Sequence, residues 1–155
     1  MQDLIGEYQC RLDAKSRFML PAGLRKQLDP ECKDTFVMNR GYEGCLTLYP
    51  LPAWKKLSTH LSSLNMFIAD HRKFYRQFHN GATQIQLDKA GRMLMPKNLM
   101  RFASIGKEIV LFAYADRIEV WAKDHYEKYM SETQDDFEAL AEAVMGKGPD
   151  NEPKA

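Results

Sequence analysis

Apolar and polar residues along the chain follow one pattern that occurs twice. Apolar residues between positions 5 and 12 and the run Phe18-Met19-Leu20 predict two strands separated by a polar turn. Four residues of this segment recur 75 positions later (88 − 13): Asp13, Arg17, Pro21 and Leu24 return as Asp88, Arg92, Pro96 and Leu99. Residues 46–49 correspond to residues 118–121 at an offset of 72 (118 − 46). The chain is therefore predicted to be a tandem duplication of one small domain.

Each copy predicts the order strand, turn, strand, short helix, strand, turn, strand, longer helix. The proline that follows the second strand opens the short helix, where its missing N–H costs no hydrogen bond. The buried side of the short helices is predicted to consist of Leu24, Leu28, Leu99 and Phe102. The later strands are expected at residues 35–39, 45–49, 108–112 and 117–121.

Three longer helices complete the prediction, each with an apolar side at helical spacing. The helix of residues 53–64 is expected to bury Trp54, Leu57, Leu61 and Leu64. A basic linker helix of residues 65–80, which has no expected counterpart in the second copy, carries Phe67, Phe74 and Phe78. We favour a buried stripe for these aromatic residues over a surface that stacks on nucleic-acid bases. A terminal helix of residues 132–145 is expected to turn Phe137, Leu140, Ala141 and Val144 inward.

This pattern divides the chain into five segments. We expect a first repeat with its helix at residues 1–64, a linker helix at 65–81 and a second repeat at 82–130. A C-terminal helix at 131–146 and a disordered tail at 147–155 follow. A half-chain of roughly 75 residues would be marginally stable by itself, so the two halves are expected to share one core.

The net charge of the chain is close to zero, so it gives little information about binding partners. The formal charge is +1, of which residues 131–155 carry −5 (seven acids, two lysines) and the remainder carries +6. A basic body with an acidic tail suits a polyanion binder but is also common elsewhere. No apolar run approaches the roughly 18 residues of a membrane span, and no signal peptide precedes the first strand, so we expect a cytoplasmic protein without a membrane partner.

No pattern of catalytic or cofactor-binding residues is present in the sequence. The four histidines and three cysteines lack the close spacing of a metal site or a disulfide framework. There is no nucleophile elbow and no phosphate-binding glycine loop. Asp13 and Asp88 each precede an arginine by four residues, which favours an ionised carboxylate that stabilises a turn. We therefore expect a protein that is not an enzyme and that has no cofactor, metal or small-molecule substrate.

Basic residues gather on or beside the two predicted turns. The first copy carries Arg11, Lys15, Arg17, Arg25 and Lys26, and the second carries Lys89, Arg92 and Arg101. The second copy is less basic because Gln86, Ala90 and Met100 take the places of Arg11, Lys15 and Arg25. By alternation along its strand, Arg11 is expected on the solvent side. Two interpretations remain open here: a surface that faces nucleic acid, or a solvated surface in which Arg17 is tied to Asp13.

These residues carry a resemblance to a known family. Ile5-Gly6-Glu7-Tyr8, residues 12–17 with Pro21, and the second Asp88–Arg92 motif with Pro96 resemble the MraZ family over about residues 4–145. Ser16 departs from the pattern, which has glycine there as at Gly91. The resemblance implies an α+β fold of tandem AbrB-like swapped-hairpin β-barrel halves with flanking helices.

The resemblance also implies a function. MraZ proteins are bacterial transcriptional regulators that bind direct repeats in double-stranded promoter DNA upstream of the division and cell-wall gene cluster, as ring-shaped homo-oligomers at the nucleoid. It implies DNA-facing roles for Arg11, Lys15, Arg17, Arg25, Lys26, Lys89, Arg92 and Arg101. The alternatives are an AbrB-like antitoxin or protein-partner binding module, and a structural ring protein without a nucleic-acid partner.

Overall fold

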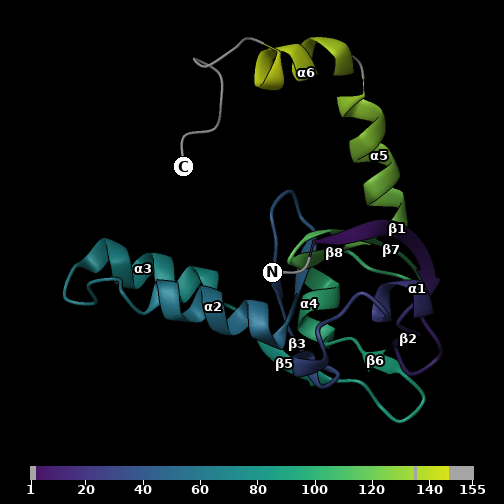
Figure 1. The fold of residues 1–155 in the computed structure, drawn as a ribbon, viewed down its shortest axis with the longest axis horizontal. Helices are drawn as coiled ribbons and strands as arrows, with labels where there is room; N and C mark the ends of the chain where they lie inside the picture. The colour runs from purple at the N-terminus through teal and green to yellow at the C-terminus, as the bar shows by residue number, and fades with distance from the viewer. Residues whose placement is uncertain (1–2, 135, 147–155) are drawn as a thin grey trace. The chain divides into compact units, whose positions relative to one another are not determined.

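A computed structural model describes residues 3–134 and 136–146 of the chain (Figure 1). The tail predicted to be disordered, residues 147–155, lies outside the described residues. The chain divides into two compact units, Met1–Lys123 and Asp124–Ala155, and each is described by itself.

Apart from the short 3-10 helix η1, which the described residues show only in the first half, both halves of the chain have the same order of strands and helices. The first half contains β1 (Leu4–Arg11), β2 (Arg17–Met19), α1 (Ala22–Arg25), η1 (Pro30–Cys32), β3 (Thr35–Arg40), β4 (Leu46–Pro50), α2 (Leu51–Leu61) and α3 (Ala69–Phe78). The second half contains β5 (Thr83–Gln86), β6 (Arg92–Leu94), α4 (Lys97–Phe102), β7 (Glu108–Ala115), β8 (Arg117–Ala122), α5 (Lys123–Thr133) and α6 (Phe137–Met145). The fold is α+β. Each half ends in two helices, so α3, which we expected to lack a counterpart, takes the same place in the order as α6.

The main sheet interlocks the two halves by exchanging strands. It is antiparallel, with six strands in the order β1-β7-β8-β4-β3-β5. The first strand of each half therefore pairs with the third strand of the other half: β1 with β7, and β5 with β3. Among the described residues no pairing joins β1 to β5, so the sheet is open rather than a closed barrel.

An approximate two-fold axis relates the two halves. Thr47 of β4 pairs with Glu119 of β8, its own equivalent at the offset of 72 (119 − 47). In a separate two-stranded sheet of β2 and β6, Phe18 pairs with Met93, its equivalent at the offset of 75 (93 − 18). A residue that pairs with its own equivalent marks the position of such an axis, so the strand registers agree with both offsets read from the sequence.

One core draws on both halves. Phe18, Met93, Leu24, Leu99 and Phe36 belong to the same buried cluster, and none is more than 1% exposed. Burying such a side chain stabilises the fold by about 1.5–3 kcal/mol relative to leaving it in water. The prediction for the short helices is correct for Leu24 and Leu99, and Leu28 packs against the cluster. It is wrong for Phe102, which is 37% exposed and lies under the guanidinium carbon of Arg40 at 4.6 Å from its ring centre.

The apolar stripe predicted for residues 65–80 is largely exposed. The helix covers only Ala69–Phe78, and it lies beside α2 as a helical hairpin (Figure 1). Phe78 stacks on Trp54 of α2 with 6.1 Å between ring centres, whereas Phe67 is 96% exposed and Phe74 51%. The prediction of a buried stripe was wrong because helical spacing shows which side chains share a side, not whether another element covers it.

The terminal helix predicted at residues 132–145 corresponds to α6 but starts later, because its first two residues belong to α5, the longer helix of the second copy. α5 ends at Thr133 and α6 begins at Phe137, with Asp136 in the left-handed conformation (φ 74°), which a continuous α-helix cannot accommodate. Phe137 and Leu140 of α6 are 69% and 58% exposed, and Val144 is also exposed, so no other element of the described second unit covers these side chains. Within its own unit, α6 thus has an uncovered apolar side.

Candidate nucleic-acid interface

The two-stranded ribbon of β2 and β6 has an inner and an outer side. Phe18 and Met93 pair at its centre and are buried. Because side chains alternate along a strand, their neighbours point to the opposite side. The outer side of the ribbon therefore consists of Arg17, Met19, Arg92 and Leu94, with Arg17 opposite Leu94 and Met19 opposite Arg92.

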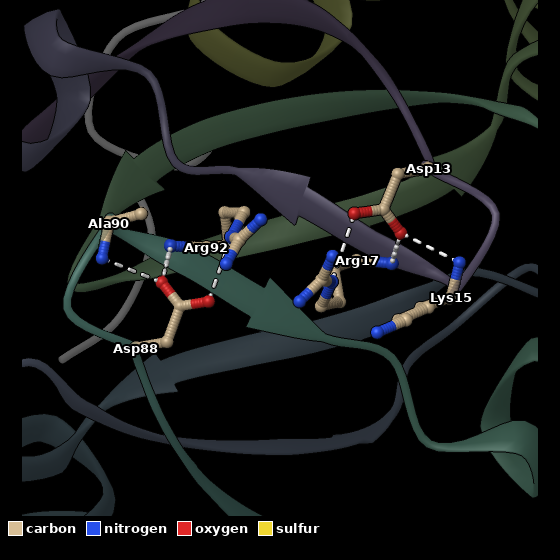
Figure 2. Close-up of polar contacts among 6 residues, drawn as sticks. All are labelled: Asp13, Lys15, Arg17, Asp88, Ala90 and Arg92. Carbon is tan, nitrogen blue, oxygen red and sulfur yellow. Dashed lines mark hydrogen bonds and ion pairs between the residues drawn. The ribbon is translucent and has the colours of Figure 1, made fainter.

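A turn anchored by Asp13 leads into β2. One carboxylate oxygen, Oδ1, accepts hydrogen bonds from the backbone N–H groups of Lys15 (2.9 Å) and Arg17 (3.0 Å). The other, Oδ2, accepts from Arg17 Nε at 2.9 Å, and the backbone closes the turn with Asp13 N donating to Arg17 O. The carboxylate thus accepts from the backbone amides two and four residues ahead. Figure 2 shows this arrangement.

The second turn repeats these bonds at the other end of the ribbon. Asp88 Oδ1 accepts from the backbone N–H groups of Ala90 and Arg92, each at 2.9 Å, and Oδ2 accepts from Arg92 Nε at 2.8 Å. Figure 2 shows both aspartates holding their arginines in the same way. Both arginines bond through Nε, and within the described residues their Nη groups make no further hydrogen bond.

These bonds determine the charge state of both aspartates. The pKa of Asp13 lies below its ordinary value, first because the Arg17 backbone N–H donates to the carboxylate. The pKa of Asp88 is lowered in the same way, first by the Arg92 backbone N–H. Each carboxylate therefore stays ionised and keeps its acceptor role at neutral pH.

The two turns differ at their left-handed position. Gly91 has φ 85° and Ser16 has φ 60°, so a serine adopts a conformation that favours glycine. Both residues also link the turns to the strands across the ribbon: Gly91 O accepts from Leu20 N at 3.1 Å, and Ser16 O accepts from Met95 N at 2.9 Å.

Arg25 lies at the second turn and not, as expected, at the first. A Cβ atom on Gly91 would lie 2.8 Å from Arg25 Nη1, and Arg25 Nη2 bonds to Asp34 Oδ2 at 2.9 Å. The reason is the antiparallel register: β2 starts at its own turn but ends beside Arg92, so the helix that follows β2 begins at the other turn. The basic residues of one copy are therefore divided between the two ends of the ribbon.

The remaining basic candidates are all exposed. Arg11 ends β1 on its solvent side, opposite Glu108 of β7, as strand alternation predicts. The other four, Lys15, Lys26, Lys89 and Arg101, lie in the turns or at the ends of the short helices. Sequence reasoning missed Met19 (53% exposed) and Leu94 (56% exposed), although alternation around the buried Phe18 and Met93 was a signal that could have found them.

Comparison with known proteins agrees with this duplicated arrangement. The sequence model of one family, described as "MraZ protein, putative antitoxin-like", matches residues 4–77 and again residues 78–147. The chain belongs to the MraZ family. A relative from Christiangramia forsetii, named transcriptional regulator MraZ, is 44% identical over 94% of this chain and 95% of its own length. Relatives of the same name from Flavobacterium psychrophilum and Moorella thermoacetica are 40% and 39% identical, over 98% and 91% of this chain and 98% and 96% of their own lengths.

Membership in the MraZ family confirms the resemblance drawn from the doubled motif. The relatives are named as regulators, which supports the prediction that the chain is not an enzyme. Within the part of the chain that the structure describes, no cluster of three histidine, cysteine or acidic side chains could hold a metal ion. No helix among the same residues is long and apolar enough to cross a membrane.

Proposed function

We propose that this MraZ-family chain is a sequence-specific DNA-binding transcriptional regulator that acts on direct repeats in a promoter. The observation that carries the proposal is the outer side of the β2–β6 ribbon, where two aspartate-anchored turns hold Arg17 and Arg92. The names of the relatives support the regulatory role, and the target inferred is the promoter of the division and cell-wall gene cluster. Such a regulator would act in the cytoplasm at the nucleoid.

Arg17 and Arg92 are suited to base recognition rather than to bulk charge. Each is paired with an aspartate through Nε, which partly neutralises it and fixes its direction. The Nη groups can then donate two parallel bonds to guanine O6 and N7 in the major groove. Met19 and Leu94, which alternate with the arginines on the same side, can contact thymine methyl groups.

The other basic candidates are suited to phosphate contacts. Exposed lysine and arginine side chains supply affinity and register on the duplex without reading bases. We assign this role to Arg11, Lys15, Lys26, Lys89 and Arg101. Arg25, paired with Asp34 beside Gly91, would support the second turn and contact the backbone there.

Assembly would multiply these contacts. A ring of equal subunits presents its DNA-binding surfaces in one direction around the ring, which suits direct repeats, and linkage raises the effective concentration of each surface. The exchange of β1 and β5 between the halves supports a relation to swapped-hairpin AbrB-like barrels, and we propose that relation for the two repeats.

A gel-shift titration with the upstream region of the protein's own gene tests the proposal. Arg17→Ala and Arg92→Ala should each weaken specific binding by about 1–3 kcal/mol and reduce the preference over scrambled DNA. Lys15→Ala should weaken binding to all sequences alike and lower the salt slope by about 1. Lys55→Ala, an exposed lysine on α2, is the matched control. Parent-like binding by both arginine variants would overturn the assignment of the ribbon.

A protein-partner binding module, such as an antitoxin, is the second candidate. It is favoured by the exposed apolar side of α6, which includes Phe137 and Leu140. The same titration separates the two, because this candidate alone predicts no salt-dependent shift of the upstream DNA by the parent protein.

A further inference from the structure

The loop between α2 and α3 presents three consecutive apolar side chains to solvent. Met66, Phe67 and Ile68 are 42%, 96% and 45% exposed. Runs of three or more exposed apolar residues are avoided in proteins unless they have a function. We call residues 65–68 the hairpin tip.

The hairpin tip is held in one conformation by polar side chains. Asn65 Oδ1 accepts from the Phe67 backbone N–H at 3.0 Å, and the Asn65 N–H donates to His71 Nδ1 at 3.1 Å. Arg72 Nη1 donates to Met66 O at 2.8 Å. An apolar surface that is ordered before binding loses little conformational entropy when a partner covers it, so this tip is suited to docking.

A complementary surface lies on α6. Its exposed apolar residues follow helical spacing along one side: Phe137, Leu140, Val144 and Met145. Glu138 and Glu142 are exposed on the same short helix, one turn apart. On α3, next to the hairpin tip, the exposed charges Lys73 and Arg76 have the opposite sign. The first turn of α3 also carries the exposed acid Asp70, so it is Lys73 and Arg76, further along the helix, that complement the acids of α6.

We propose that the hairpin tip and α3 of one copy bind α6 of a second copy of this chain. The inference rests on the oligomer of the proposed function and names its contact. Apolar side chains would supply the affinity, while Glu138 and Glu142 facing Lys73 and Arg76 would set the orientation. Each copy carries both surfaces and the two differ, so the contact is head-to-tail and adds subunits until the rotation closes a ring.

Mixed cysteine cross-linking tests the contact directly. Phe67→Cys and Leu140→Cys are made as separate proteins. Each reduced protein is oxidised alone, and an equal mixture of the two reduced proteins is oxidised in parallel, all without DNA. The mixture should give a covalent dimer that neither variant gives alone. The parent supplies the background, which should be low because Cys32 and Cys45 are buried and burial raises the pKa of the half-buried Cys10 to about 11. No dimer above background in the mixture would overturn the proposal.

Light scattering over a dilution series gives the second measurement. Phe67→Ser should raise the concentration at which the assembly half-dissociates by about tenfold or more, as expected for an aromatic anchor. Tyr42→Ser, which removes another exposed aromatic residue (83% exposed), should leave it unchanged. Lys73→Glu with Arg76→Glu should weaken assembly, and adding Glu138→Lys with Glu142→Lys should restore it.

The outcomes separate this contact from the proposed function. An oligomeric parent whose assembly is unchanged by Phe67→Ser overturns the contact and leaves the oligomer intact. A monomeric parent overturns both. A parent that assembles as predicted but does not shift its upstream DNA supports the contact and overturns DNA binding.

Discussion

Single residues determine the shape of the two turns that carry the candidate site. The spacing Asp-x-x-x-Arg was enough to predict that Asp13 and Asp88 would be ionised acceptors in a turn, because an aspartate four residues before an arginine can reach both its amide and its guanidinium. The position of Arg25 could not be predicted in this way. It depends on the register between β2 and β6, which no local pattern in the sequence encodes.

The lowered pKa values of Asp13 and Asp88 predict a loss of stability in acid. A carboxylate whose folded-state pKa lies below its unfolded value contributes stability above the unfolded pKa and loses it as the pH falls through the folded pKa. Urea unfolding from neutral pH to about pH 3 should therefore show a falling midpoint. The Asp13→Asn, Asp88→Asn double variant is the control and should show a shallower fall. An equally steep fall in that variant would assign the acid sensitivity to other groups.

Ser16 predicts a stabilising substitution. The left-handed conformation costs a non-glycine residue roughly 1–2 kcal/mol, and glycine loses about 0.5–1 kcal/mol of that through its freer unfolded state. Ser16→Gly should therefore raise the free energy of unfolding by about 0.5–1 kcal/mol. Gly91→Ser is the matched reverse and should destabilise, because its Cβ would lie 2.8 Å from Arg25 Nη1. Chemical denaturation measures both, and a destabilised Ser16→Gly variant would contradict the strain assigned to φ 60°.

At the scale of helices and strands, the apolar pattern of the sequence predicted where the elements lie better than it predicted what covers them. All eight strands lie where alternation or the repeat placed them, because buried strands need apolar side chains in register. The stripe on α3 was correctly seen as apolar but wrongly assigned to the core, and the stripe on α6 is uncovered within its own unit. Helical spacing is the same for a side covered within the chain and for one that another chain would cover, so the sequence could not separate these cases.

Because α1 begins at the second turn, the structure predicts which arginine is energetically coupled to Arg25 in DNA binding. In a double-mutant cycle of DNA binding, Arg25→Ala combined with Arg92→Ala should deviate from additivity by more than about 0.5 kcal/mol, since both belong to the second turn. Arg25→Ala combined with Arg17→Ala should be additive within about 0.5 kcal/mol, although Arg17 is closer in sequence. Gel-shift affinities at one salt concentration provide the four values of each cycle. Coupling of Arg25 to Arg17 instead of Arg92 would contradict this prediction and assign Arg25 to the first turn.

For the whole molecule, strand exchange makes the two halves depend on each other. β1 pairs along its full length with β7, and β3 pairs with β5, so each half provides a strand that completes the other's part of the sheet. The sequence predicted a shared core from size, because neither half could bury enough surface alone. It did not predict that the sharing would occur by exchange of the first strands, since the pairing partner of a strand is a property of the chain's overall path.

This dependence predicts the behaviour of separated halves. A fragment of residues 1–80 contains β1 without β7 and β3 without β5, so two strand edges and much of the common core would be exposed. At about 80 residues it lacks the buried surface to compensate, and it should show no cooperative thermal transition as a monomer. Mixing it with a fragment of residues 81–155 should restore a cooperative transition in a 1:1 complex, because β1 then regains β7 and β5 regains β3.

Circular dichroism and analytical ultracentrifugation measure the folding and stoichiometry of these fragments. The approximate two-fold axis adds one alternative partner: a second copy of fragment 1–80 could offer its β3 in place of β7, since these strands are equivalent. Any folding of this fragment by itself should therefore be that of a homodimer and should depend on concentration. The full-length chain cleaved between residues 80 and 81 is the control and should remain folded. A cooperative, concentration-independent transition of monomeric fragment 1–80 would mean that the first half builds its own core and that the exchanged strands are dispensable for it.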